Sequence, residues 1–265
     1  MNKTIKITLC LFSLMIGISA SAQTFQRWMQ MARSGNPKAM VMVGNSYLYG
    51  DNGVAKDAAK AAYWYEKGAE KGLDGAQYSL GNLYFDGVGV KQDYKKAFDL
   101  YSKAAAQGLP DALVNLGLCY EGGFGVEQNY EKAFKNYQIA SQKGNPDGTL
   151  DMALCYIRGL GVAKNEAKGY GMIKQLAENG HGNSLCYLGH CYETGTYYEK
   201  DIKKALELYD EASNEGSQEA YYNMAMIYVN GYDNGSLVAD GKRMLGYLAE
   251  AGYQPAIEAL KQLNK

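Results

Sequence analysis

The chain has 265 residues, and its net charge at neutral pH is close to zero, at −1. This balance leaves no basic excess that could displace counterions from nucleic acid, and it gives no attraction to an anionic membrane surface. We therefore expect neither nucleic acid nor a membrane surface as a partner. The order of residues along the chain is more informative about function.

Residues 1–22 have the pattern of a secretory signal peptide. Lys3 and Lys6 come before an apolar stretch at residues 7–18, and residues 20–22 read Ala-Ser-Ala, the small residues typical of a cleavage site. The apolar stretch is too short for a permanent membrane span. We expect cleavage near Ala22 and an exported mature chain, periplasmic or secreted, that contains no membrane span.

From residue 39 onward, one pattern of small, apolar and aromatic residues recurs every 36 or 37 residues. In its clearest form it reads Ala-x-x-x-Leu-Gly-x-x-Tyr-x-x-Gly, as at residues 76–87 and 112–123. A fixed period of this length is typical of a solenoid, in which each repeat packs on its neighbours. The six copies begin at residues 39, 76, 112, 148, 184 and 220.

The first half of each repeat predicts a helix. With the first residue of the repeat numbered 0, Ala, Leu, Gly and Tyr fall at positions 0, 4, 5 and 8, which lie on one helical face. Glycine inside a helix costs about 1 kcal/mol relative to Ala, so its recurrence predicts a neighbouring helix that packs too closely for a larger side chain. Glycine stands at position 5 in four repeats, at Gly44, Gly81, Gly117 and Gly189, and Ala153 and Ala225 replace it in the other two.

The second half of each repeat predicts another helix. A glycine-rich turn leads to a residue suited to cap its N-terminus, and a glycine suited to positive φ follows its C-terminus. The capping candidates are Asp57, Asp93, Asn129, Asn165 and Asp201. The terminating glycines are Gly72, Gly108, Gly144, Gly180, Gly216 and Gly252. Residues 24–34 and 256–262 read as single helices that cap the two ends.

The second repeat resembles the Sel-1-like repeat, a relative of the tetratricopeptide repeat. The matching residues are Ala76, Leu80, Gly81, Tyr84, Gly87, Gly89, Val90, Asp93, Lys96, Ala97, Tyr101, Lys103, Ala104, Ala105 and Gly108. The resemblance extends over residues 23–265 and implies an all-α fold, an α/α superhelical solenoid of about six helix-turn-helix repeats with capping helices at both ends. It also implies a protein-interaction scaffold or adaptor. Repeats four and six depart most from the pattern, with Gly169 and Gly241 where Ala is expected.

Four possible zinc ligands lie close together in the fifth repeat, and they are His181, Cys186, His190 and Cys191. Their spacing matches no established zinc pattern. Cys191 recurs with Cys119 and Cys155 directly before the repeat tyrosine. We therefore expect buried thiols that behave as small hydrophobic side chains, rather than metal ligands or disulfides.

The 24 tyrosines are the strongest bias in the composition, and we expect those at position 8 and those in the second helices to form the core. By analogy with tetratricopeptide superhelices, positions 2, 6 and 9 of the first helices should face a concave groove. This strip is largely apolar, which typically marks an interaction surface; in a tightly wound superhelix the same residues would pack on each other. The candidate partner-binding residues are Tyr78, Asn82, Phe85, Leu118, Leu154, His190, Tyr222 and Met226, and Val114, Ile157 and Cys186 occupy further positions of the strip.

Nothing in the chain predicts catalysis. A nucleophilic hydrolase needs an activated Ser or Cys with a base in reach, whereas the sequence has only two histidines and lacks the Ser-x-x-Lys and Gly-x-Ser-x-Gly patterns. We expect no enzyme, no catalytic residue and no cofactor. The favoured interpretation is an interaction scaffold of the cell envelope that binds a protein or peptide partner in the groove.

The alternative is an envelope hydrolase or a β-lactam-binding protein on the same scaffold. Some exported Sel-1-like relatives that carry a cysteine pair in each repeat have been linked to β-lactam binding. This chain lacks such pairs.

Overall fold

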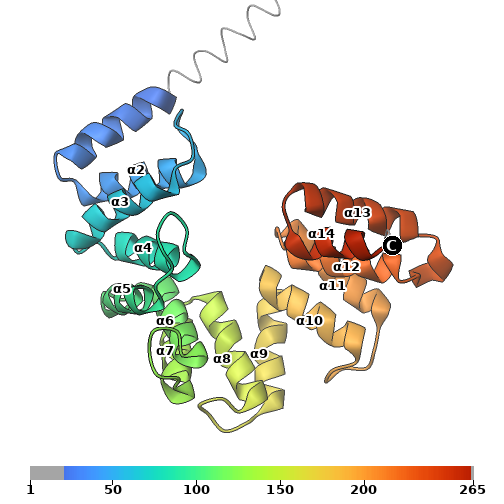
Figure 1. The fold of residues 1–265 in the computed structure, drawn as a ribbon. Coiled ribbons are helices and arrows are strands. Elements are labelled where there is room, and N and C mark those ends of the chain that lie inside the picture. Colours follow the sequence, from blue (N-terminus) through green and yellow to red (C-terminus); the bar gives the residue numbers. More distant parts are fainter. Residues whose placement is uncertain (1–20, 264–265) are drawn as a thin grey trace, which may run out of the picture. The chain divides into compact units, whose positions relative to one another are not determined.

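The computed structural model describes residues 21–263, and in this part of the chain every regular element is a helix (Figure 1). The signal-peptide prediction lies outside these residues, apart from the last two residues of the predicted segment. Residues 21–33 form the first helix described. The first helices of the six repeats are α2 (Pro37–Tyr49), α4 (Asp74–Asp86), α6 (Pro110–Gly122), α8 (Pro146–Arg158), α10 (Gly182–Thr194) and α12 (Gln218–Val229).

The second helices follow in alternation. They are α3 (Ala58–Glu70), α5 (Tyr94–Ala106), α7 (Tyr130–Gln142), α9 (Glu166–Glu178), α11 (Ile202–Asn214) and α13 (Val238–Glu250). A short 3₁₀ helix, η1 (Tyr232–Gly235), replaces the glycine-rich turn of the sixth repeat, and α14 (Gln254–Leu263) ends the described chain. The predicted all-α solenoid of helix hairpins is confirmed. No helix in the described part combines the length and hydrophobicity that a membrane span requires.

Each first helix begins two residues before the position that the repeat pattern indicates, so that the repeat alanine is its third residue. The reason lies in the preceding turn. A glycine with positive φ, such as Gly108 at 92°, ends the previous helix, and one extended residue, such as Leu109, follows it. Pro110 can then occupy the first helical turn, where its missing N–H costs no hydrogen bond.

The five predicted N-caps are all confirmed. In each case the side-chain oxygen accepts a hydrogen bond from the backbone N–H three residues later, as Asp93 Oδ1 does from Lys96 at 3.0 Å. The cap residue also donates its own N–H to the carbonyl of the repeat tyrosine, as Asp93 does to Tyr84 at 2.9 Å. The first bond caps the second helix, and the second joins its start to the first helix of the hairpin. The sixth repeat lacks the cap, because Leu237 stands there without a side-chain hydrogen bond.

The predicted close contact at the helix glycines is confirmed, and its partner is a buried tyrosine of the second helix. A Cβ atom at Gly81 would lie 2.7 Å from Cε1 of Tyr101, and one at Gly44 would lie 2.5 Å from Cε1 of Tyr65. These distances are shorter than side chains tolerate, so the tyrosine ring occupies the space that glycine leaves. The same contact occurs at Gly117 with Tyr137 and at Gly189 with Tyr209.

Repeats four and six replace this contact by a different one. Ala153 and Ala225 stand where the other repeats have glycine, and the fully buried Ile173 and Leu245 stand where they have tyrosine. The glycine has moved to the second helix: a Cβ at Gly241 would lie 2.7 Å from the Ala225 carbonyl oxygen. The departures at Gly169 and Gly241 therefore let the two helix backbones approach each other.

The prediction that the tyrosines at position 8 and in the second helices form the core is only partly right. In the second helices Tyr65, Tyr101, Tyr137 and Tyr209 are buried in the core, but Tyr63, Tyr130 and Tyr247 are exposed. The tyrosines at position 8 are only partly buried. A lysine ammonium group lies over the ring in four repeats, for example Lys96 Nζ at 4.8 Å from the centroid of Tyr84. In the fifth repeat Tyr192 instead stacks on Tyr198, with centroids 4.8 Å apart.

The chain divides into two compact units, one ending at Gly148 and the other beginning at Thr149. Within the first unit, each helix from α2 to α7 packs against the next one in sequence, and within the second unit the same holds from α9 to α14. Phe25 and Met29 of the first helix bury themselves against α2, and Ala256 and Ala259 of α14 join the core of the last repeats. The two predicted end caps are thus confirmed.

Candidate functional site

Three of the predicted partner-binding residues meet in one hollow of the first unit. Asn82 and Phe85 of α4 and Leu118 of α6 line a space of about 210 Å³ between these helices. The remaining lining residues are Asp86, Tyr101 and Asn115. We call the surface formed by these six residues and the neighbouring Tyr78 the α4–α6 surface.

The polar floor of the hollow is a hydrogen-bonded network within the chain. The Tyr101 hydroxyl donates to Asn82 Oδ1 at 2.8 Å, and Asn115 Nδ2 donates to the same oxygen at 3.0 Å. Burial raises the pKa of Tyr101, so its hydroxyl stays protonated and keeps this donor role. Asn82 therefore has a structural function, because it satisfies a buried tyrosine.

The wall of the hollow is aromatic and apolar. The ring of Phe85 packs against Tyr94 and Phe124, with centroids 5.1 and 5.3 Å away, and lies 6.4 Å from Tyr101. These contacts hold Phe85 in place. Leu118, by contrast, is 40% exposed and contributes an apolar side chain that the chain itself does not cover.

Four of the predicted partner-binding residues lie in the second unit and differ in exposure. His190 of α10 is exposed, and its Nδ1 lies 3.8 Å from Glu193 Oε2. Tyr222 and Met226 of α12 are partly buried against the core of the last repeats, and Leu154 of α8 is partly buried against the cluster around Ile173. Their role in binding stays a prediction.

Three further positions of the predicted strip face the interior. Val114, Ile157 and Cys186 are 8%, 9% and 6% exposed. They belong to packing between helices, so the strip at positions 2, 6 and 9 is not one continuous exposed surface. Helix periodicity predicts which residues share one face of a helix, but it does not predict that a neighbouring helix covers part of that face.

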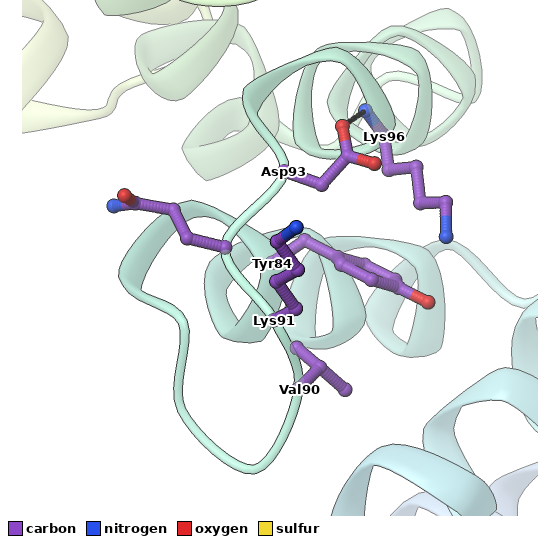
Figure 2. A pocket seen from close by; sticks show the side chains of 6 residues that line it. Tyr84, Val90, Lys91, Asp93 and Lys96 are labelled. Carbon is purple, nitrogen blue, oxygen red and sulfur yellow. Dashed lines mark hydrogen bonds between the residues drawn. The ribbon is translucent and has the colours of Figure 1, made fainter.

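A second hollow, of about 440 Å³, lies beside the turn between α4 and α5. Figure 2 shows Tyr84, Val90, Lys91, Asp93 and Lys96 around it, with the Lys96 side chain on the same side as the Tyr84 ring. The hydrogen bond that the Asp93 side chain accepts and the lysine–tyrosine contact recur in other repeats. This hollow therefore results from the way each turn joins the two helices of a repeat, and it is not specific to one repeat.

The possible zinc ligands of the fifth repeat differ in burial. Cys186 and Cys191 are buried, whereas His190 is exposed. Burial raises the pKa of both thiols to about 11, so without a metal they stay protonated at neutral pH and behave as small hydrophobic side chains. Within the described residues, no three His, Cys, Asp or Glu side chains come together in an arrangement that could hold a metal ion.

Sequence reasoning missed Tyr101, Asn115 and Asp86 as members of the hollow. Tyr101 was assigned to the core, which is correct, but its hydroxyl reaches the floor of the hollow. A signal for this was present: the four repeats with a tyrosine at the position of Tyr101 carry Asn or Glu at position 6 or 9 of the first helix. The Ile173 and Leu245 repeats carry only apolar residues there.

A family model of the Sel1 repeat matches six segments of the chain, at residues 37–73, 75–109, 110–145, 146–181, 182–217 and 218–243. Among curated proteins, the ERAD-associated E3 ubiquitin-protein ligase component HRD3A of Arabidopsis thaliana is 33% identical over 66 residues. This match covers 25% of the present chain and 10% of HRD3A.

Two solved structures share both fold and sequence with the chain. One is c5321, a protective antigen of uropathogenic Escherichia coli strains with an SLR fold, which is 32% identical with a TM-score of 0.59; the match covers 89% of this chain and 50% of that one. The other is a Sel1 repeat protein from Oxalobacter formigenes, which is 27% identical with a TM-score of 0.67 over 84% of this chain and 96% of that one. The present chain thus spans half the length of the first.

Proposed function

Because the chain belongs to the Sel1 repeat family, we propose that it is a non-catalytic scaffold or adaptor that binds a protein or peptide partner on the surface of its first helices. Sel1-repeat proteins typically bind protein partners, and the family is generally non-enzymatic. The name of HRD3A describes a component of a larger enzyme assembly, which is the kind of role that an adaptor performs.

The observation that carries the proposal is the hollow of the α4–α6 surface. It joins an exposed apolar side chain, Leu118, to a fixed aromatic wall at Phe85. Interfaces draw most of their binding free energy from a few such anchors in well-packed pockets. A rigid wall also limits the side-chain entropy that binding costs.

The remaining predicted contacts lie in the second unit and extend the proposed binding surface to Leu154, His190, Tyr222 and Met226. His190 is the most informative of them, because it is exposed and its replacement does not disturb the core. Leu154, Tyr222 and Met226 also pack against core clusters, so changes there affect folding and binding together.

We also propose that the protein works in the cell envelope after export, because residues 1–22 have the pattern of a signal peptide. The N-terminus of protein recovered from the producing cells tests this directly. A mature chain that begins near Gln23 in the envelope or in the medium supports the proposal. Full-length protein in the cytoplasm contradicts it.

The binding surface can be tested with the mature protein as bait. A partner captured from the envelope fraction is purified and titrated against Leu118→Ala, Phe85→Ala and His190→Ala. We expect each substitution at an anchor to weaken binding by about 1–3 kcal/mol. Lys103→Ala, on an exposed position of α5, is the matched control and should bind normally.

Circular dichroism distinguishes a lost contact from a lost fold. Leu118→Ala removes a side chain that is 40% exposed, so its helix content and melting temperature should stay close to those of the unchanged protein. If the three variants bind with full affinity while Lys103→Ala does not, the partner binds the second helices, and the proposed surface is wrong.

A further inference from the structure

We propose that the α4–α6 surface receives a basic side chain of the partner, an Arg or Lys within a short linear segment that also carries an apolar residue. This inference rests on the interaction function proposed above and adds the chemistry of the partner. Its basis is the combination of one carboxylate, an apolar wall and no cationic group among the six residues that line the hollow.

The charged side chains of the first helices α4 and α6 are all acidic. Neither α4 nor α6 contains a Lys or Arg, and their carboxylates are Asp74, Asp86, Asp111 and Glu121. The intervening second helix α5 has the opposite balance, with Lys95, Lys96 and Lys103 against Asp99. Because the whole chain is nearly neutral, this segregation is a property of the surface and not of the composition.

Three of these carboxylates interact with residues of the α4–α6 surface or with the buried Tyr137 of the next repeat. Asp86 is exposed and lines the hollow itself. Burial is the largest cause of the raised pKa of Tyr78, and the charge of Asp111 raises it further. Glu121 accepts a hydrogen bond from the Tyr137 hydroxyl at 2.8 Å. Their combined field attracts a cation.

The floor of the hollow needs no partner. Asn82 is bonded to Tyr101 and Asn115, and no buried side-chain nitrogen or oxygen in the described residues lacks a hydrogen bond. Recognition therefore falls on the groups that the chain leaves exposed at the rim, the Asp86 carboxylate and the Leu118 side chain.

An Arg or Lys side chain matches this arrangement along its whole length. Its apolar stem can lie against Phe85 and Leu118 while its charged head reaches the Asp86 carboxylate, as long basic side chains do on other apolar surfaces. Arg fits better than Lys, because its planar guanidinium group binds a carboxylate through two hydrogen bonds and stacks on aromatic rings.

One part of this contact, a cation over an aromatic ring, occurs within the chain. Lys168 Nζ lies 4.0 Å from the ring centroid of Tyr156, and Lys132 Nζ lies 5.2 Å from that of Tyr120. These contacts show that the tyrosine-rich repeat accommodates a cation over an aromatic ring at its surface. The hollow differs in that its cation has to come from another molecule.

The test uses a displayed library of random short linear peptides selected against the mature protein. We expect the selected peptides to be enriched in Arg or Lys next to an apolar residue. One selected peptide, labelled with a fluorophore, is then titrated against variants. Asp86→Asn and Asp111→Asn should each weaken binding by about two- to five-fold, the range of an exposed ion pair, and added salt should weaken it further.

Glu66→Gln on α3 is the matched control, because it removes one exposed carboxylate from a second helix of the same unit and should leave the affinity unchanged. Exchanging the peptide's Arg for Gln should lower affinity for the unchanged protein but have little further effect on Asp86→Asn. Such non-additivity identifies the two groups as partners.

The outcomes separate this inference from the function on which it rests. If selected peptides require Leu118 but are neutral or acidic, the basic-partner inference is wrong while the binding surface stands. If no selected peptide depends on either Leu118 or Asp86, the binding surface itself is wrong. Equal losses for Asp86→Asn and Glu66→Gln would show only a general effect of net charge and would overturn the inference.

Discussion

At the scale of single residues, the chain contains two alternative solutions for the contact between the helices of a repeat. Four repeats combine glycine in the first helix with a buried tyrosine in the second, and the hydroxyl of that tyrosine bonds to an Asn or Glu of the first helix. Two repeats combine alanine with Ile173 or Leu245 and carry no polar residue at the corresponding positions. The three positions change together, because a tyrosine needs both space for its ring and a partner for its hydroxyl.

Replacing glycine by alanine should therefore change the free energy of unfolding in opposite directions at different positions. Gly171→Ala and Gly246→Ala place a methyl group in open space within a helix and should stabilise the protein by up to about 1 kcal/mol. Gly81→Ala places it 2.7 Å from a Tyr101 ring carbon, and the overpacking cost of about 1–3 kcal/mol should exceed the gain in helix propensity.

Urea denaturation provides the measurement, and a Tyr101→Leu background provides the control. Leucine removes the ring that collides with the new methyl group, so the cost of Gly81→Ala should become smaller there. An equal cost in both backgrounds would show that the ring is not the cause.

The buried thiols lead to a second prediction at this scale. Burial raises the pKa of Cys119 to about 12 and that of Cys186 and Cys191 to about 11, so at pH 8 the reactive thiolate is scarce and shielded. We expect iodoacetamide to label these three residues slowly in the native protein and rapidly in denaturant. Mass spectrometry of peptides from both samples decides the question, and equal labelling rates would contradict the burial of these cysteines.

At the scale of helices, the capping residues link the sequence pattern to the geometry of each hairpin. Backbone N–H groups at the start of α3 bond to the Asp57 carboxylate, and the bond from Lys60 is the largest cause of its lowered pKa. A carboxylate with a lowered folded-state pKa contributes stability at pH values above its unfolded value, near 3.9, and this contribution is lost as the pH falls through the lowered value.

Asp57→Asn should remove this pH dependence. An amide oxygen can accept the same bond, as Asn129 and Asn165 do in the third and fourth repeats, and it does not titrate. We expect the stability difference between the unchanged protein and Asp57→Asn to shift in favour of the variant as the pH falls below about 4. Urea midpoints measured across this range provide the test, and a difference independent of pH would contradict the role assigned to the carboxylate.

The helices also show what sequence alone can and cannot establish here. Caps such as Asp93 could be predicted because their function depends on bonds to residues three positions away. Phe85 and Leu118 could be placed on one face by helical periodicity, but Tyr101 and Asn115 could not be added to them, since that contact joins three different helices. For the same reason, Val114 was expected at the surface although a neighbouring helix buries it.

At the scale of the whole molecule, stability should be distributed repeat by repeat, because α2 to α7 in the first unit and α9 to α14 in the second each pack on their neighbours in sequence. Phe25 is buried against α2 at one end of the chain, and Leu245 is fully buried in α13 near the other end. No core cluster that contains one of these residues contains the other. A cavity at one end should therefore leave the opposite end intact.

Hydrogen exchange followed by mass spectrometry can test this on the mature protein. Phe25→Ala should accelerate exchange in residues 21–33 and in α2 and α3, by an amount that corresponds to about 3–5 kcal/mol of lost packing, while α12 to α14 keep their protection. Leu245→Ala should show the converse, with faster exchange confined to the second unit. Two variants in different units serve as controls for each other, since each leaves the region disturbed by the other unchanged. If either substitution accelerates exchange equally in every helix, the chain unfolds as one cooperative body, and its repeats do not have the local stability expected of a solenoid.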